Sequence, residues 1–311
     1  MDNSSNPTGW TADQWSLVNR TVASEVNKVS VAGAFLPCYG PLKNTAEVVR
    51  RQNIYEGRNG EGREGETLAV EPLMVDDVET HRLWTASLYI HLKQQQIAQE
   101  QLEDALLAFR RAANLLARAE DAIVFNGLPH ADPSRSELDR IHVPTICRVT
   151  GGEHAPGLVA AGRHETTRAG AGENVKPPYG ENLVPAVAAA ISELEMHGHL
   201  GPFACLMGMK AFVAAQTPND GSLVLPSDRI EPLLGMKILR SGTLDPGQIV
   251  VVSLAGDPID LVIATSPTVQ FLHLTDEARY VFRVYERFVL RVKERHAVSS
   301  FQLVETAAST K

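Results

Sequence analysis

Three short motifs in the chain carry residue types that could do chemistry. The first, Gly60-Glu61-Gly62-Arg63-Glu64-Gly65, has the spacing G-x-G-x-x-G, whose glycines let a backbone turn approach a dinucleotide pyrophosphate. That function requires a buried strand before the motif and a helix after it. Here charged residues and glycines precede it and a segment of β character follows. We therefore interpret the motif as the tip of a surface loop.

Two pairs of histidine and glutamate, Glu153-His154 and His164-Glu165, form the second motif, because imidazole and carboxylate groups bind zinc. A zinc-binding helix places two histidines on one face, and His164-Glu165-Thr166-Thr167-Arg168 lacks the second one. The chain also lacks the G-x-S-x-G elbow of serine hydrolases and the G-x-x-x-x-G-K-[ST] phosphate loop. We predict no metal site, no bound cofactor and no enzymatic activity for the chain itself.

The third motif is Glu120-Asp121, a pair of carboxylic acids that could exchange protons. Neighbouring side chains of an α-helix point about 100° apart, which does not suit a shared acid–base task. The two residues also fall in the last turns of a predicted helix, where the helix dipole disfavours negative charge. We expect a structural role, with an arginine of the same subunit or of a neighbour lying against both carboxylates.

The composition is that of a folded globular protein with one large or two ordinary domains: 311 residues, 44% hydrophobic and 21% charged. A net charge of -8 disfavours nucleic acid as a general partner, because binding phosphates requires a basic face. Cys38, Cys147 and Cys205 are far apart in the sequence and fit a reducing compartment. The N-terminus lacks a signal-peptide pattern, and no apolar run reaches the roughly 18 residues of a membrane span. We expect a cytoplasmic protein with no membrane contact.

Two helices dominate the pattern of apolar residues. The capping box Thr11-Ala12-Asp13-Gln14 predicts the start of an N-terminal helix, whose apolar side chains recur at helical spacing at Trp15, Val18, Val22, Val26 and Val29. A second, longer amphipathic helix is predicted from Gln101 to Gly127, because this segment is rich in alanine and leucine and ends in Asn-Gly.

The other segments predict an α+β fold. Residues 44–67 are rich in charge and glycine and are flanked by segments of β character at 46–54 and 68–92, which predicts a two-stranded arm with the glycine-rich loop at its tip. An αβ region follows from about residue 185. Near the C-terminus, Tyr280 to Val292 alternates as a half-buried antiparallel strand, with Glu286 as the one polar residue on its apolar face.

These features together resemble the encapsulins, nanocompartment shell proteins of bacteria and archaea that have the HK97-like fold of tailed-phage major capsid proteins. The residues that carry the resemblance are collinear over nearly the whole chain. They are Thr11-x-x-Gln14-Trp15, Gly40-Pro41, Ala119-Glu120-Asp121-Ala122-Ile123-Val124-Phe125-Asn126-Gly127, Gly201-Pro202-Phe203-Ala204-x-Leu206-Met207-Gly208, the alternating strand at 280–292, and residues 297–304.

The resemblance implies a division of the chain into five parts. Residues 1–43 would hold the N-terminal helix and the start of the P-domain, and residues 44–92 the extended E-loop. Residues 93–129 would form the long spine helix of the P-domain, and 130–256 the A-domain. Residues 257–311 would return to the P-domain as strands.

The resemblance also implies a function: self-assembly into a closed icosahedral shell, a homo-oligomer that encloses a cargo enzyme docked through a short targeting peptide. The docking positions would be Val22, Val26, Val29, Phe35, Leu36, Val269 and Phe271. Relatives often place charged residues after the helix-ending glycine, whereas this chain has Gly33-Ala34-Phe35-Leu36-Pro37, so more hydrophobic docking is expected. Some members stack a flavin on a tryptophan near the end of the E-loop strand. The segment here is Ile90-His91-Leu92-Lys93-Gln94, which argues against a flavin.

The loop that would line the five-fold pore is Thr217, Pro218, Asn219, Asp220, Gly221 and Ser222, and a ring of Asp220 carboxylates would favour the passage of cations. Two alternatives stay open. One is a prophage major capsid protein of the same fold, disfavoured because about ten polar residues lead straight into the first helix, where phage shells carry a scaffolding segment. The other is a hydrolase or bacteriocin-like enzyme, for which the sequence shows no nucleophile, base or metal site.

Overall fold

The computed structural model describes residues 8–43, 45–56, 73–76, 78–162, 182–219 and 221–303. Its larger sheet has five strands in the order β1-β13-β14-β6-β8. Strand β14 pairs antiparallel with both β13 and β6, so it is the central strand, and the prediction of an antiparallel strand at 280–292 is confirmed. The strands are β1 (Cys38–Tyr39), β6 (Trp84–Lys93), β8 (Arg148–Gly151), β13 (Ile259–Leu274) and β14 (Arg279–Val292).

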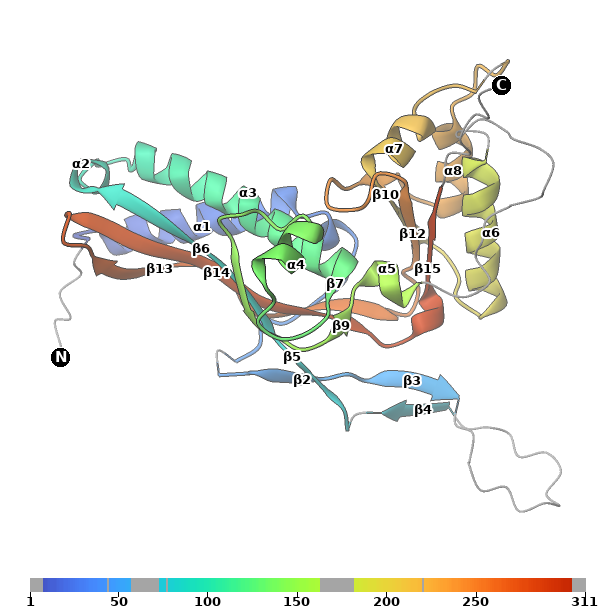
Figure 1. Cartoon of the computed structure of the whole chain (residues 1–311), viewed down its shortest axis with the longest axis horizontal. Helices are drawn as coiled ribbons and strands as arrows, with labels where there is room; N and C mark the ends of the chain where they lie inside the picture. Colours follow the sequence, from blue (N-terminus) through green and yellow to red (C-terminus); the bar gives the residue numbers. More distant parts are fainter. Residues whose placement is uncertain are drawn as a thin grey trace.

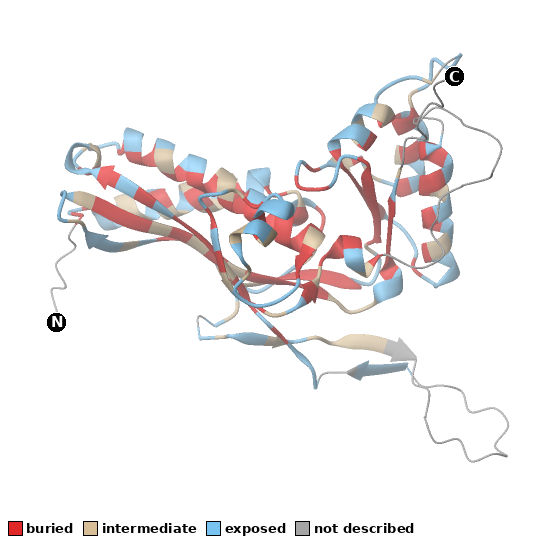
Figure 2. Ribbon diagram, viewed as in Figure 1, coloured by how far each residue is buried: buried red, intermediate tan, exposed pale blue. Residues whose placement is uncertain are grey.

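Two long helices, α1 (Ala12–Val29) and α3 (Glu103–Asn126), pack against each other and against this sheet (Figure 1). The predicted capping box is confirmed: the Gln14 N–H donates to the Thr11 hydroxyl at 3.2 Å, and the Thr11 N–H donates to the Gln14 side chain at 2.9 Å. The predicted long helix is also confirmed, with 24 residues and a C-cap at Gly127. The buried residues of α1 are Val18, Val22 and Val26, whereas Ala119 to Phe125 of α3 are all buried, and Figure 2 shows α3 turning mostly red toward this end.

A smaller sheet, in the order β11-β10-β12-β15, has its own apolar core beneath three helices. Its strands are β10 (Phe203–Met207), β11 (Leu239–Arg240), β12 (Gln248–Ser253) and β15 (Val298–Gln302), and its helices are α6 (Leu183–Met196), α7 (Met209–Ala215) and α8 (Pro226–Leu234). The last strand therefore joins this layer, whereas the sequence predicted a return to the larger layer for everything after residue 257. The other domain boundaries stay predictions.

The predicted arm is present in the described residues as two short strand pairs, β2 (Val48–Arg50) with β5 (Thr80–Arg82) and β3 (Asn53–Glu56) with β4 (Leu73–Asp76). We refer to the described residues between 48 and 82 as the arm, which is drawn below the two sheets in Figure 1 and contacts the body where the Ile54 N–H donates to the carbonyl of Lys293. The glycine-rich motif at 60–65 lies outside the described residues. The segment that follows the arm, β6, belongs to the larger sheet. The prediction that the arm extends to residue 92 was therefore wrong at its C-terminal end.

Two arginines of β14 attach the base of the arm to the larger sheet. Arg287 donates to the carbonyl of Ala46 at 2.6 Å, and Arg291 donates to the carbonyl of Arg50 at 3.3 Å. Arg291 also forms a bidentate ion pair with the buried Asp260, at 2.9 and 2.6 Å. A planar guanidinium can serve both partners at once, which fixes the direction in which the arm leaves the body.

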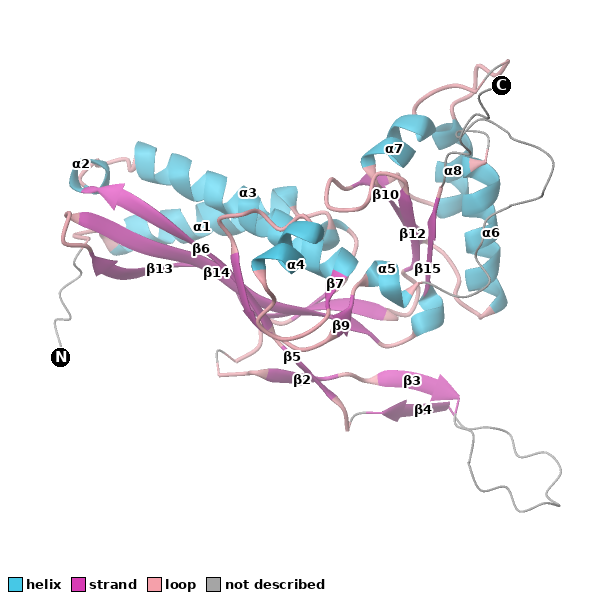
Figure 3. Cartoon of the chain, in the orientation of Figure 1, coloured by secondary structure: helices cyan, strands magenta, loops and turns pink. Residues whose placement is uncertain are grey.

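Short elements lie between the longer helices and strands (Figure 3). They are η1 (Ala32–Ala34), α2 (Gln94–Ile97), β7 (Gly127–Leu128), α4 (Arg135–Arg140), β9 (Ala155–Pro156), α5 (Leu158–Ala161) and η2 (Arg295–Ala297). Strand β7 continues directly from α3 and pairs with β9, and α5 then packs against β15 of the smaller sheet. In the part of the chain that the structure describes, no helix has both the length and the apolar character to cross a membrane.

Candidate functional site

The predicted docking residues lie where α1, the segment after it and β13 meet, but most of them face this chain's own core. Val22, Val26, Phe35, Leu36 and Val269 are buried. Val29 is exposed, and Phe271 is partly buried in an aromatic cluster beside Tyr280 and Phe282. A bound peptide could therefore touch only part of the predicted set directly, and the docking assignment stays a prediction.

An open groove of about 590 Å³ lies between α1 and β13. Most of its side chains are polar, unlike the hydrophobic docking face that the sequence predicts. Its lining comprises Ser16, Asn19, Arg20 and Ala23 of α1, Thr265, Ser266, Pro267 and Thr268 of β13, and Tyr285 of β14.

An irregularity in β13 forms one wall of the groove. The pairing of β13 with β14 shifts register between Ile263 and Thr268, and Ser266 and Pro267 have no partner in the ladder. Proline cannot donate to a sheet ladder and is typical of such bulges. The Asn19 side chain then joins the helix to the strand, because its oxygen accepts from the Thr268 hydroxyl at 3.0 Å and from the Val269 N–H at 2.9 Å.

The groove offers hydroxyl groups, one arginine and one aromatic ring to a ligand. The guanidinium of Arg283 lies 4.5 Å from the centre of the Tyr285 ring, a cation–π contact that fixes this ring at the groove's edge. Such a surface suits a short extended peptide that makes hydrogen bonds as well as apolar contacts. The Ser-Pro pair within an otherwise β-rich segment was the sequence signal for this site, and it was missed.

The predicted pore loop follows α7 at the outer end of the smaller layer. Thr217 lies just beyond the C-cap residue Gln216, and its hydroxyl donates to the carbonyl of Val213 at 2.7 Å. The Ser222 N–H donates to the Asn219 carbonyl at 3.0 Å. Asp220, the residue on which the charge argument depends, lies outside the described residues. Leu223 is fully exposed and Val224 half exposed immediately after the loop.

Glu120 and Asp121 are buried, and the prediction of an arginine beside them is wrong for the described part of this chain. Asp121 accepts the backbone N–H groups of Val31 at 3.0 Å and Ala32 at 2.8 Å, so it caps the turn that follows α1. Glu120 accepts the Ser30 hydroxyl at 2.7 Å. Backbone and hydroxyl donors of the first corner of the chain thus take the place of a cation.

A third carboxyl group, that of Glu286 on β14, faces Glu120 from the sheet. Glu286 is 0% exposed, and no N–H group of the described residues donates to its oxygens. Burial, followed by the charge of Glu120, raises the pKa of Glu286 well above its ordinary value. Burial likewise raises the pKa of Glu120, and raises that of Asp121 to about 7. Two buried carboxyl groups in contact are stable only when they share a proton. The cluster therefore has a structural role, and its contribution to the stability of the fold depends on pH.

The possible metal ligands that the structure describes have other partners. Glu153 instead forms an ion pair with Arg51 at 3.2 Å and lies 3.3 Å from His81, and His154 contacts the carbonyl of Pro129 at 3.1 Å. His164 and Glu165 lie outside the described residues. Within the described ranges, no group of three or more histidine, cysteine or carboxylate side chains is placed to hold a metal ion.

Comparisons with known proteins found one family model and several solved structures that are similar to this chain. A family model described as "Encapsulating protein for peroxidase" matches residues 150–289. No curated protein sequence matches the chain. Similar solved structures include a virus-like particle from Pyrococcus furiosus, which is 14% identical over 93% of this chain and 99% of that chain, with a TM-score of 0.59.

Two further structures extend the comparison. Gordonia phage Cozz is 11% identical over 91% of this chain and 87% of that chain, with a TM-score of 0.55. The SrpI encapsulin complex of Synechococcus elongatus PCC 7942 is 11% identical over 89% of this chain and 88% of that chain, with a TM-score of 0.51. These structural likenesses extend over both layers and over most of each chain.

Proposed function

We propose that this chain, which has the HK97-like fold of capsid shells and matches the encapsulating-protein family over residues 150–289, is a self-assembling shell subunit that encloses a cargo enzyme. The fold predicted from the sequence is confirmed. The observation that carries the proposal is the likeness to a virus-like particle along 93% of this chain and 99% of that one, together with the family match. The role is structural, with no chemistry assigned to the chain.

Exposed apolar side chains support self-assembly. Two groups of them lie on the arm (Leu73, Met74, Val75 and Val78) and around α7 and α8 of the smaller layer (Met209, Val213, Leu223, Val224 and Leu233). Contiguous apolar surface on a soluble subunit is typical of an interface with another protein. In a closed shell, neighbouring copies would cover both places.

Expression of the chain alone tests assembly. Size-exclusion chromatography and negative-stain microscopy are expected to show closed particles of uniform size, and a monomer or small oligomer under the same conditions would refute the proposal. The contents of the particles separate the two kinds of shell. Co-purified protein held by a terminal peptide favours a nanocompartment, whereas packaged DNA favours a phage capsid, which the likeness to Gordonia phage Cozz keeps as the alternative.

The groove between α1 and β13 is our proposed docking site for the cargo peptide, together with the accessible Val29 and Phe271. Ala23 is the smallest side chain in its lining, so Ala23→Arg is expected to fill the groove and to reduce cargo per shell by about tenfold or more. Ser24 is exposed on the same helix and does not line the groove, so Ser24→Arg is the matched control. The ratio of cargo to shell protein in purified particles is the measurement, and equal loading in both variants would contradict the assignment.

The loop from Thr217 to Ser222 is our proposed pore lining, on the basis of its place after α7 beside exposed apolar residues. A ring of Asp220 carboxylates would concentrate cations at the pore mouth. Asp220→Asn is expected to slow the quenching by Co²⁺ of a dye enclosed in the shell, most clearly at low ionic strength. An unchanged quenching rate would place the cation path elsewhere.

A further inference from the structure

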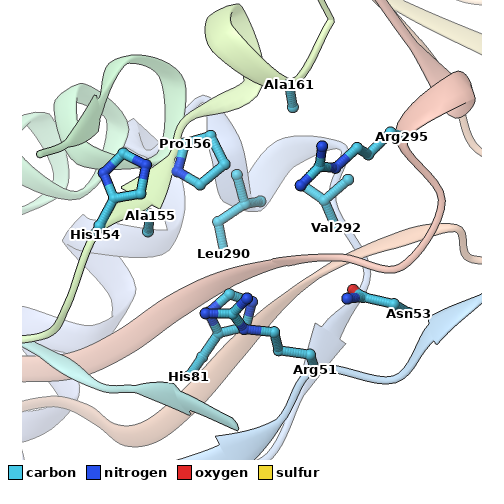
Figure 4. A pocket seen from close by; sticks show the side chains of 10 residues that line it. All are labelled: Arg51, Asn53, His81, His154, Ala155, Pro156, Ala161, Leu290, Val292 and Arg295. Atoms are coloured by element: carbon cyan, nitrogen blue, oxygen red, sulfur yellow. The ribbon is translucent and has the colours of Figure 1, made fainter. Parts of the chain in front are cut away.

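A pocket of about 140 Å³ lies at the junction of the arm, the larger sheet and the elements that connect the two layers (Figure 4). Arg51, Asn53 and His81 come from the arm, and Leu290 and Val292 come from β14. The remaining lining residues, His154, Ala155, Pro156, Ala161 and Arg295, come from the segments around β9, α5 and η2. The pocket is therefore shared by parts of the chain that are far apart in sequence.

The polar lining of the pocket is basic, because it includes two guanidinium groups, two imidazoles and one amide but no carboxylate. Arg295 is exposed at the edge, and no hydrogen bond or ion pair joins its side chain to another described residue. Arg51 is bound at its two terminal nitrogens, by Glu79 at 2.8 Å and Glu153 at 3.2 Å, but its Nε is buried without a hydrogen-bond partner. The Nε–H of Arg51 is thus a hydrogen-bond donor without an acceptor among the described residues.

The charges around the pocket indicate which groups would attract a ligand. His81 is buried and lies 3.3 Å from Glu153 through Nδ1, while burial and the neighbouring charge of Arg51 lower its pKa. Glu79 and Glu153 offset Arg51 from outside the lining. Arg295 has no such counter-charge among the described residues, so it supplies the surplus positive charge at the edge of the pocket.

We propose that this pocket binds a small oxyanion, with inorganic phosphate as the simplest example, held between Arg51 of the arm and Arg295 of the body. A volume of about 140 Å³ corresponds to several water molecules at about 30 Å³ each, which leaves room for a tetrahedral or planar oxyanion. Guanidinium groups are well suited to such ligands because they offer paired donors in one plane.

A bound oxyanion would join the arm to the body. Arg51 and Asn53 belong to the arm, whereas Arg295 follows the last strand of the larger sheet. An ion that contacts both would add charge-assisted hydrogen bonds across the base of the arm and restrain its direction. This inference concerns the geometry of the subunit and does not depend on a cargo or on a pore.

Titration of assembled shells with inorganic phosphate tests the proposal, by calorimetry in a phosphate-free buffer at pH 7. We expect saturable binding of one phosphate per subunit, and Arg295→Gln is expected to weaken it by about tenfold or more. Arg279 is a partly exposed arginine at the far end of the same β14 hairpin, paired with Glu277 at 3.4 Å, so Arg279→Gln is the matched control and should leave the affinity unchanged. Because Arg295 is exposed, its replacement should not disturb folding, and circular dichroism checks this.

Three outcomes would overturn the proposal. One is the absence of saturable binding, and another is equal loss of affinity in Arg295→Gln and Arg279→Gln. The third is phosphate binding by dissociated subunits but not by assembled shells, which would mean that a carboxylate of a neighbouring copy fills the pocket.

Discussion

Replacing Glu286 with glutamine is expected to stabilise the subunit at pH 7 and to leave its stability nearly unchanged near pH 4.5. Glu286 is fully buried and faces Glu120, and burial and that neighbour raise the pKa of the Glu286 carboxyl group well above its ordinary value. Folding therefore requires the carboxyl group to hold a proton. A glutamine amide has nearly the same shape and can donate to the Glu120 carboxylate without holding an added proton.

The sign of the pH dependence follows from the direction of the shift. A carboxyl group whose pKa rises on folding contributes stability that is complete below its unfolded pKa and is lost as the pH rises through its folded pKa. For Glu286 the loss begins near its ordinary value of 4.5 and amounts to about 1.4 kcal/mol per pH unit. We therefore expect the free energy of unfolding of Glu286→Gln to exceed that of the natural chain by an amount that grows as the pH rises from 4.5 to 7.

Urea unfolding followed by tryptophan fluorescence at several pH values between 4.5 and 7 measures this difference, at one subunit concentration because assembly also stabilises the fold. Asp121 has a pKa of about 7, so part of the pH dependence should persist in Glu286→Gln. Glu195 is an exposed glutamate on α6, and Glu195→Gln should follow the natural chain. Parallel curves for the natural chain and Glu286→Gln would show that the shared proton is not at this pair.

The sequence alone indicated each acid of the carboxyl cluster but not their contact. Glu120, Asp121 and Glu286 each stood out, as acids at the wrong end of a helix or on the apolar face of a strand. Their contact could not be predicted, because it depends on how α3 crosses β14 and on the corner after α1, whose backbone amides hold Asp121. An arginine was the expected partner because a carboxylate near a helix C-terminus is normally offset by a cationic side chain. The sequence does not show where unpaired backbone N–H groups lie.

The fold was more predictable than the sites. The capping box at Thr11, the C-cap at Gly127 and the alternation of β14 are local signals, and the structure has all three. The groove depends on a register shift in β13, and the basic pocket on Arg51 and Arg295, which are distant in sequence. The placement of β15 in the smaller sheet likewise follows from tertiary pairing, which no local pattern encodes.

Replacing Gly127 with alanine is expected to lower the stability of the subunit more than the same replacement at Gly157 or Gly198. Gly127 ends α3 with a φ of 71° and forms the bridge to β9, so the added Cβ would overlap the backbone nitrogen of Gly157 and the carbonyl oxygen of Ala155. With a ψ of 176° this is a conformation found essentially only in glycine, so an L-residue there costs roughly 1–3 kcal/mol, and forced overpacking costs roughly 1–3 kcal/mol more. A total of about 2–6 kcal/mol is a large share of the stability of an ordinary domain.

Two further glycines separate the backbone cost of this change from the steric cost. Gly198 has a similar φ of 82° with open space around it, so Gly198→Ala should show the backbone cost alone. Gly157 has an ordinary φ of −70° and faces Gly127 across the same contact, so Gly157→Ala should show mainly the steric cost. Soluble yield and thermal midpoint should therefore fall least in Gly198→Ala and most in Gly127→Ala. If Gly127→Ala behaved like Gly198→Ala, the close contact between the end of α3 and the start of α5 would not be what joins the spine helix to the second layer.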